Sequence, residues 1–446
     1  MTATARALAA ATPADRDRYV DLLRVASLGT VIAGHWLMAA VSGDGIGNLL
    51  ALLPALQVLT WALQIMPVFF FVGGFSHALS YRSLARRGEG PVYAAFLRAR
   101  LRRLLRPTLA FVLVWAALAL AVQLAGRGDG PLGGAALRLV TQPLWFIGIY
   151  LAMVALTPPL LKLHERHGWA VFAALAGAAA LVDVLRFALG VPYVEFLNSA
   201  LVWLAVHQLG FLRADGRIRR PAVLAAAGLA GAALLVACGP YPLSMVGMPG
   251  EKVSNMAPPT LALLCHGLWL VGAVQLAARP AGAWLERPRV WRAVVAANGI
   301  AMTAFLWHLT AMLAVYAAQL ALGIDLPAPA TAAWWAQVPV RILAAAALTG
   351  VFVALFRRFE APAPAPVPSP AGRPAPASGP CAAAGTTLCL LGVLGLSMTG
   401  LGGLLDGRTA TLIAFPVTAP AAIGMAWAGA WLVERSAPAR RVRLRG

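Results

Sequence analysis

Three polar residues in the first apolar segment have types and a spacing that suit acid–base chemistry. Asp21 comes three residues before Arg24, and His35 follows eleven residues after Arg24. On a helix, Asp21 lies one turn from Arg24 and can hold its guanidinium in place. Eleven residues make about three turns, so Arg24 and His35 share one face, about 16 Å apart along the axis. His35 is then either a general base for a hydroxyl or a hydrogen-bonded contact to a neighbouring helix.

A second histidine, His308, lies in the apolar run FLWHLTAM, ten residues after Asn298. We expect His308 in the outer half of its helix, as His35 is in the first helix. Two histidines at similar depth could line one cavity, which makes His308 a second candidate for the catalytic site.

Other ionisable residues inside apolar segments have less specific patterns. Asp183 and Arg186 are one turn apart, and we expect an ion pair that is either structural or part of a cavity wall. His207 and His266 are interpreted as hydrogen-bonded residues of a helix bundle. No metal-ligand spacing is present, and the four cysteines have no C-x-x-C pattern. The pair Gly73–Gly74 favours close helix packing.

An arginine-rich stretch, FLRARLRRLLRP at 96–107, could bind phosphate groups. On a helix Arg98, Arg102 and Arg106 line one face, while Arg100 and Arg103 lie on another. Guanidinium groups suit the phosphates of a nucleotide-bearing donor such as coenzyme A. The alternative is that these arginines set the membrane topology and bind lipid headgroups.

The elements that must position these residues are membrane helices. The chain is 60% hydrophobic and 12% charged, with a mean hydropathy of +0.77, and its apolar runs are long enough to cross a bilayer. We predict an all-α polytopic membrane protein with a ten-helix core and a two-helix extension. The expected spans lie near 20–41, 50–80, 104–125, 143–162, 169–189, 195–212, 221–238, 258–277, 294–318 and 333–356, then 383–404 and 409–433. The second contains Pro54 and Pro67, so it is expected to be kinked or preceded by a short interfacial helix.

The distribution of basic residues predicts the orientation. Basic residues concentrate in alternate loops, which are cytoplasmic by the positive-inside rule. The loop at 42–49 has no basic residue and is expected outside, and both termini are expected to be cytoplasmic. Because the net charge of +20 lies mostly in these short loops, it does not indicate a nucleic-acid partner.

A proline-rich segment divides the chain. Residues 361–380, APAPAPVPSPAGRPAPASGP, cannot form a helix and are expected to be a flexible linker. The predicted organisation is a cytoplasmic tail at 1–19, a membrane core at 20–360, the linker, a two-helix appendage at 381–434 and a basic cytoplasmic tail at 435–446. The appendage is interpreted as a packing or dimerisation element.

The chain resembles the bacterial acyltransferase family 3, membrane enzymes that O-acylate sugars, polysaccharides and other exported or secondary metabolites. The matching pieces are Asp21, Arg24 and His35, the run PVFFFVGGF at 67–75, RRLLRP at 102–107, LWFIGIYL at 144–151, and Phe305 with His308. They occur in this order over the ten expected core helices. PGEKVSNMAPPTLAL at 249–263 is similar to the actinobacterial branch, whereas the two-helix extension departs from the common pattern.

The resemblance implies roles for these residues. His35 would be the catalytic base that deprotonates an acceptor hydroxyl, supported by Arg24 and Asp21, with His308 in the same site. Arg100, Arg103 and Arg106 would match the family's arginine motif and bind the donor. The implied partners are an acyl-CoA co-substrate, a glycan or metabolite acceptor and membrane lipids, with no tightly bound cofactor. The acyl group is expected to be acetyl, and the location the bacterial plasma membrane.

The rival interpretation is a multi-helix transporter or flippase for a small solute or lipid-linked sugar, in which buried charges line a solute path. No internal two-fold repeat and no pair of broken helices at matching positions supports it.

Overall fold

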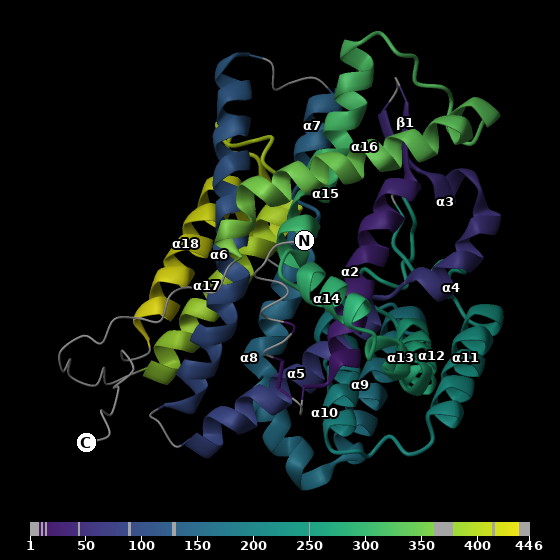
Figure 1. The fold of residues 1–446 in the computed structure, drawn as a ribbon, viewed down its shortest axis with the longest axis vertical. Helices are drawn as coiled ribbons and strands as arrows, with labels where there is room; N and C mark the ends of the chain where they lie inside the picture. The colour runs from purple at the N-terminus through teal and green to yellow at the C-terminus, as the bar shows by residue number, and fades with distance from the viewer. Residues whose placement is uncertain are drawn as a thin grey trace. The chain divides into compact units, whose positions relative to one another are not determined.

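A computed structural model describes residues 9, 12–13, 16–42, 45–87, 91–126, 131–248, 250–360, 378–412 and 415–436. Over these residues the protein is mainly helical, with two short β-hairpins (Figure 1). Within the same residues, eight helices are long and apolar enough to cross a membrane, or nine if one bent pair forms a single span. The fold is therefore that of a polytopic helical membrane protein. The expected N-terminal tail is described only in part, and most of the linker and of the basic C-terminal tail lie outside the described residues.

The chain forms two compact units. Unit 1 comprises Met1–Ala78 and Pro159–Val351, and unit 2 comprises Leu79–Pro158 and Phe352–Gly446. The helices that lie wholly in unit 1 are α2 (Arg18–Met38), α3 (Leu49–Leu52), α4 (Thr60–Leu63), α9 (Trp169–Phe187), α10 (Asn198–Ala214), α11 (Pro221–Cys238), α12 (Leu261–Leu276), α13 (Ala278–Leu285), α14 (Pro288–Asn298) and α15 (Ala301–Ala321). Those wholly in unit 2 are α6 (Val92–Leu124), α7 (Pro131–Leu139), α17 (Ser378–Thr399) and α18 (Ala419–Arg435). The chain passes between the units within α5 (Met66–Arg87), α8 (Pro143–His167) and α16 (Ala332–Phe356).

The start of α2 is fixed by a side-chain cap. The Asp17 carboxylate accepts a hydrogen bond from the Val20 N–H at 3.1 Å, which satisfies one of the free N–H groups of the first turn. The same carboxylate accepts a 2.8 Å hydrogen bond from Arg213 on α10. At its other end α2 runs into an antiparallel hairpin of β1 (Ala39–Ser42) and β2 (Gly45–Asn48). The cap and the hairpin thus hold both ends of the helix that carries Asp21, Arg24 and His35.

The apolar stretch at 50–80 is interrupted, as its prolines predict. Before α5 the chain forms α3, the 3₁₀ helix η1 (Pro54–Leu59) and α4. The expected close packing at the glycine pair is also present, because a Cβ on Gly74 would collide with the backbone carbonyl of His207. Gly210 on α10 faces the α5 backbone in the same way. Small residues at this contact let the two backbones approach closely, as helices in membranes commonly do.

The stretch at 294–318 is not one helix. It breaks at Gly299 and Ile300, between α14 and α15. His308 consequently lies about two turns into α15, and not in the outer half of a longer helix as the sequence suggested.

Asp183 organises the loop between α11 and α12 and does not form the expected ion pair. It accepts hydrogen bonds from the Leu261 N–H at 2.7 Å and the Tyr241 hydroxyl at 3.0 Å. Asn198 donates a third, at 2.8 Å. Among the described residues no cation lies within ion-pair distance of Asp183, and the Arg186 guanidinium lies over the Phe187 ring. A buried carboxylate is satisfied equally well by several N–H and O–H donors.

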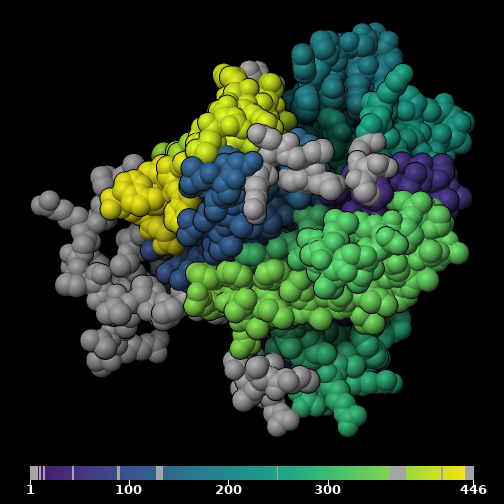
Figure 2. All heavy atoms as spheres, turned by 90° about the horizontal axis from the view of Figure 1, so that it is seen from above, coloured from purple at the N-terminus to yellow at the C-terminus, as the bar shows by residue number. Residues whose placement is uncertain are grey.

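In unit 2 the C-terminal extension packs on α6. Figure 1 shows α17 and α18 side by side, and in Figure 2 the yellow residues of the C-terminal extension lie against the blue residues of α6. Gly385 and Gly429 each face the carbonyl of the other, so the backbones of α17 and α18 approach closely. The stretch predicted as one helix over 409–433 begins instead with a hairpin of β3 (Thr409–Leu412) and β4 (Phe415–Thr418). An apolar run of β-branched residues does not distinguish strand from helix by its periodicity.

Candidate active site

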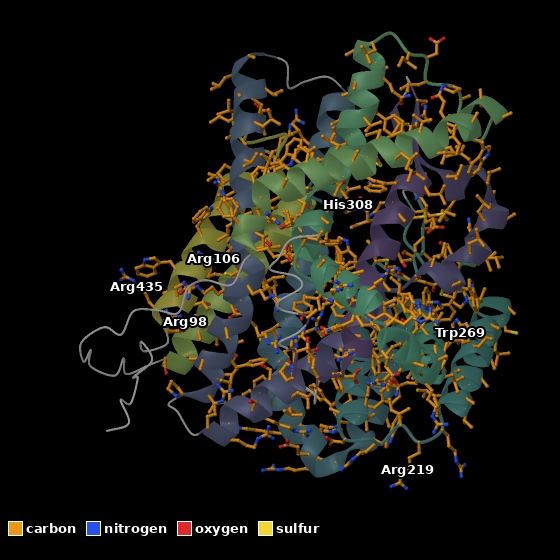
Figure 3. All side chains as sticks on the ribbon, in the orientation of Figure 1. Arg98, Arg106, Arg219, Trp269, His308 and Arg435 are labelled. Atoms are coloured by element: carbon orange, nitrogen blue, oxygen red, sulfur yellow. The ribbon has the colours of Figure 1, made fainter. Side chains whose placement is uncertain are left out.

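The two candidate histidines are in direct contact. His35 lies in the last turn of α2, and its Nδ1 is 2.8 Å from Nε2 of His308 on α15. The rings are nearly parallel, with 15° between their planes and 5.1 Å between their centroids. The two histidines, which the sequence suggested could line one cavity, are therefore in contact. Figure 3 labels His308 on its helix.

The backbone around His308 determines which nitrogen carries each proton. His308 Nδ1 lies 2.5 Å from the carbonyl oxygen of Phe305, which can only accept a hydrogen bond, so Nδ1 must be protonated. In neutral His308 the Nε2 atom is then an acceptor, and His35 Nδ1 must donate to it. The Nε2 atom of neutral His35 is left with a free lone pair, and it has no hydrogen-bond partner among the described residues. This is the arrangement that a general base requires.

His308 is further held by the residue next to His35. The Trp36 indole N–H donates a 3.0 Å hydrogen bond to the His308 backbone carbonyl and so ties α2 to α15. His308 is fully buried, whereas His35 is half-buried. His308 is therefore the more enclosed of the two histidines.

Asp21 and Arg24 form the predicted ion pair near the start of α2. Arg24 Nη1 lies 3.3 Å from the Asp21 carboxylate, and Nη2 donates a 3.0 Å hydrogen bond to the Ser76 hydroxyl on α5. Arg16 Nε makes a shorter ion pair with Asp21, at 2.6 Å. Asn298 donates to the Asp21 backbone carbonyl at 3.1 Å, so it belongs to this cluster and not to the histidine pair. The cluster joins α2 to α5 and α14.

The arginine-rich stretch lies inside α6, in unit 2, and its arginines differ in environment. Arg98 and Arg102 both form 3.3 Å ion pairs with Glu434 at the end of α18. Of the three arginines of the motif, Arg103 and Arg106 are exposed, and Arg100 is half-buried with its guanidinium 6.0 Å from the Phe96 ring centroid. Figure 3 labels Arg98 and Arg106. The extension thus occupies two arginines of α6 and leaves the charges of Arg103 and Arg106 accessible.

Several buried polar residues lie outside the expected site, and among them His207 is hydrogen-bonded within the bundle, as its sequence context indicated. His77 and His207, both fully buried, form a second histidine pair with 3.1 Å between Nδ1 and Nε2. His164 lies 2.9 Å from the Asp215 carboxylate. Arg341, in the middle of α16, is buried with an exposed fraction of 6%. The signal that marks Arg341 in the sequence is an arginine inside a long apolar run, which is costly in a membrane.

Comparison with known proteins identifies a family. The model of acyltransferase family 3, described as an acyltransferase domain, matches residues 17–357. The match covers both histidines, the Asp21–Arg24 pair and the arginines of α6, and it ends before the linker and the two-helix extension. No curated protein and no solved structure matches the chain.

Proposed function

This chain belongs to acyltransferase family 3, and on that premise we propose that it transfers an acyl group from acyl-CoA to a hydroxyl of a glycan or another exported metabolite. The acyl group is acetyl and the general base is His35. The observation that carries the proposal is the directed chain of hydrogen bonds from His35 through His308 to the Phe305 carbonyl.

In the proposed reaction the site moves one proton and exchanges the C–S bond of the thioester for the C–O bond of an ester. The acceptor hydroxyl oxygen attacks the thioester carbonyl carbon while His35 Nε2 takes the hydroxyl proton. The C–S bond then breaks, the ester stays on the acceptor, and the proton passes from His35 to the departing sulfur. CoA leaves as the free thiol.

The surrounding residues have supporting roles in this proposal. His308 keeps His35 in the tautomer whose Nε2 is free, and it stabilises the imidazolium by accepting the Nδ1–H hydrogen bond. Asp21 and Arg24 position α2 against α5. Arg100, Arg103 and Arg106 bind the donor phosphates, which agrees with the exposure of Arg103 and Arg106. The enzyme lies in the bacterial plasma membrane with both termini in the cytoplasm, where acyl-CoA is made.

A thiol-release assay tests the proposal. Detergent-purified full-length protein is given acetyl-CoA, with and without a mixture of membrane and cell-surface glycan extracts. Acceptor-dependent release of CoA by the wild type that His35→Ala abolishes supports it, and full activity of His35→Ala contradicts it. If the wild type neither releases CoA nor binds acyl-CoA, the transporter interpretation replaces it.

A further inference from the structure

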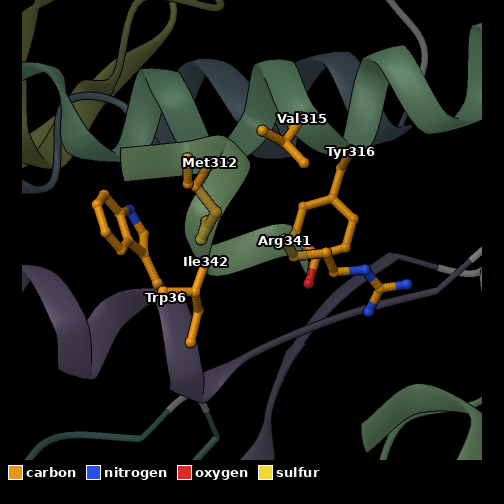
Figure 4. A pocket seen from close by; sticks show the side chains of 7 residues that line it. Trp36, Met312, Val315, Tyr316, Arg341 and Ile342 are labelled. Atoms are coloured by element: carbon orange, nitrogen blue, oxygen red, sulfur yellow. The ribbon is translucent and has the colours of Figure 1, made fainter. Parts of the chain in front are cut away.

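A small pocket lies beside the histidine pair. It is lined by Trp36, Met312, Val315, Tyr316, Arg341 and Ile342 (Figure 4). The cavity is small, about 10 Å³, which is room for about one water molecule, and it is partly open to the surroundings. Trp36 follows His35 in the chain, and Met312 lies one turn after His308. The pocket therefore lies near the proposed base, although His35 itself does not line it.

One charged side chain, Arg341, lines this otherwise apolar and aromatic pocket. Its Nε donates a 3.0 Å hydrogen bond to Gln319, and its Nη2 donates a 2.5 Å hydrogen bond to Gln337. The guanidinium also lies 4.9 Å from the centroid of the Tyr316 ring and interacts with the Tyr316 hydroxyl. The two glutamines and the ring hold the guanidinium plane in one orientation.

The charge of Arg341 is not neutralised, and one of its donors is unused. Among the described residues no carboxylate lies within ion-pair distance, and the buried Nη1 has no hydrogen-bond partner. A buried cationic donor without a partner costs more free energy than a neutral one. Gln319 and Gln337 orient the arginine without cancelling its charge, which leaves it able to bind an anion from outside the chain.

We propose that Arg341 binds an oxyanion, a carboxylate or a phosphate, carried by the acyl acceptor. The planar fork of a guanidinium matches both groups and is less suited to a neutral sugar. In the expected topology the last turn of α2 is at the extracytoplasmic side, where an exported acceptor arrives. The acceptor would place its anionic group on Arg341 and its hydroxyl at His35. This inference rests on the proposed function and adds a substrate class to it.

A binding experiment tests the inference without turnover. The thermal stability of the full-length protein in detergent is measured with glucuronate, glucose 6-phosphate and glucose as probes. A bound ligand raises the unfolding temperature in proportion to its affinity. We expect glucuronate or glucose 6-phosphate, but not glucose, to stabilise the wild type, and Arg341→Gln to lose that stabilisation.

A matched control separates this site from general effects of charge. Arg358 lies in the short 3₁₀ helix η3 (Arg357–Phe359) that follows α16. Its guanidinium also lies 4.9 Å from the centroid of an aromatic ring, that of Phe359, but Arg358 is exposed. Arg358→Gln should leave the stabilisation by the anionic probe unchanged. Gln337→Leu keeps the charge of Arg341 and removes one of the two glutamines that orient it. It provides a second test in case Arg341→Gln does not fold, and it should weaken the stabilisation by the anionic probes. The inference is overturned if glucose raises the unfolding temperature as much as the anionic probes do. It is also overturned if Arg341→Gln and Gln337→Leu are both stabilised by those probes as much as the wild type. Stabilisation by anionic phospholipid vesicles alone, with none by the sugar probes, overturns it as well.

Turnover distinguishes failure of this inference from failure of the proposed function. With acetyl-CoA as donor, Arg341→Gln should raise KM for anionic acceptors by about tenfold to a hundredfold, the effect expected for one charge-assisted hydrogen bond. The kcat and the rate with neutral acceptors should change little. If the wild type is active but Arg341→Gln changes KM equally for anionic and neutral acceptors, the proposed acyltransferase activity is supported and the proposed role of Arg341 is wrong. If the protein binds anions at Arg341 but releases no CoA, the proposed acyltransferase activity is wrong and the anion site is supported.

Discussion

The protein contains two histidine pairs with similar geometry and different surroundings. In His35–His308 the nitrogens are 2.8 Å apart, and in His77–His207 they are 3.1 Å apart. Both members of the second pair are fully buried, and His207 Nδ1 has no hydrogen-bond partner among the described residues. In the first pair a backbone carbonyl fixes the proton order, and His35 is half-buried with its Nε2 free. The first pair therefore has a defined proton order and a less enclosed histidine, and these are the features that the proposed function requires of a base.

The largest expected difference between the pairs is in activity. His35→Ala should lower the rate of CoA release by about 10²- to 10⁴-fold, the usual contribution of a general base, with little loss of folded protein. His207→Ala is the matched control. It should lower the unfolding temperature because it removes a buried side chain, while the correctly folded fraction keeps most of its activity. Thiol release per folded molecule measures both, and equal losses of activity would remove the distinction.

His308→Gln should reduce kcat by about tenfold or more, because His35 loses the oriented acceptor for its Nδ1–H. The KM for acyl-CoA should stay near the wild-type value, since His308 is not part of the proposed donor site. Steady-state kinetics separates the two constants. A rise in KM with unchanged kcat would mean that His308 contributes to binding instead.

Gly74→Ala sharpens the interpretation of the second pair as a packing contact. The added methyl group would collide with the His207 carbonyl and push α5 away from α10. We expect a loss of about 1–3 kcal/mol in stability, the usual cost of overpacking, measured as a lower unfolding temperature. Gly34→Ala, in open space on α2, serves as the control and should have no such effect.

Trp36→Phe tests a feature that the second pair lacks, the indole that holds His308 from the neighbouring helix. Loss of this single hydrogen bond should lower kcat by a factor of about two to ten. The apolar lining of the pocket is largely retained. An unchanged kcat would show that the Phe305 carbonyl alone is sufficient to orient His308.

The smallest expected effect is the contribution of Glu251 to the pH dependence of stability. This contribution must be subtracted when the stability of variants of the two histidine pairs is compared across pH. Burial raises the pKa of this loop carboxylate. Because the unfolded chain ionises first as pH rises, stability falls between the ordinary pKa of glutamate and the raised value of the folded state. Glu251→Gln should remove this decrease and be slightly more stable than the wild type above that range. Unfolding temperatures at acidic and neutral pH measure it, and a wild type without the decrease would contradict the burial effect.

The sequence predicted those parts of the site that depend on local periodicity. Helical spacing predicts the contact of Asp21 with Arg24 because both lie on one helix. The similar expected depth of His35 and His308 predicted their grouping, although α15 begins later than expected. The proton order was beyond prediction, because it depends on the side-chain rotamer that points His308 Nδ1 at the Phe305 carbonyl of its own helix, and on the contact of His308 Nε2 with His35 after α2 and α15 have packed.

Other features depend on contacts between distant segments. Glu434 reaches Arg98 and Arg102 only because α18 packs on α6, which no local pattern indicates. Gln319 and Gln337 orient Arg341 from separate helices. The strands β3 and β4 were predicted as helix, because their apolar residues suit a membrane span as well as a strand.

The most direct test of the central claim is the protonation of His35 itself. Nitrogen-15 NMR of histidine-labelled protein, with His35→Gln and His308→Gln spectra for assignment, reports which ring nitrogen carries hydrogen. We predict that neutral His35 is protonated at Nδ1 and bare at Nε2, and that His308 is protonated at Nδ1. A neutral His35 with its hydrogen on Nε2 would contradict the account, because the nitrogen that faces the acceptor could not then take a proton.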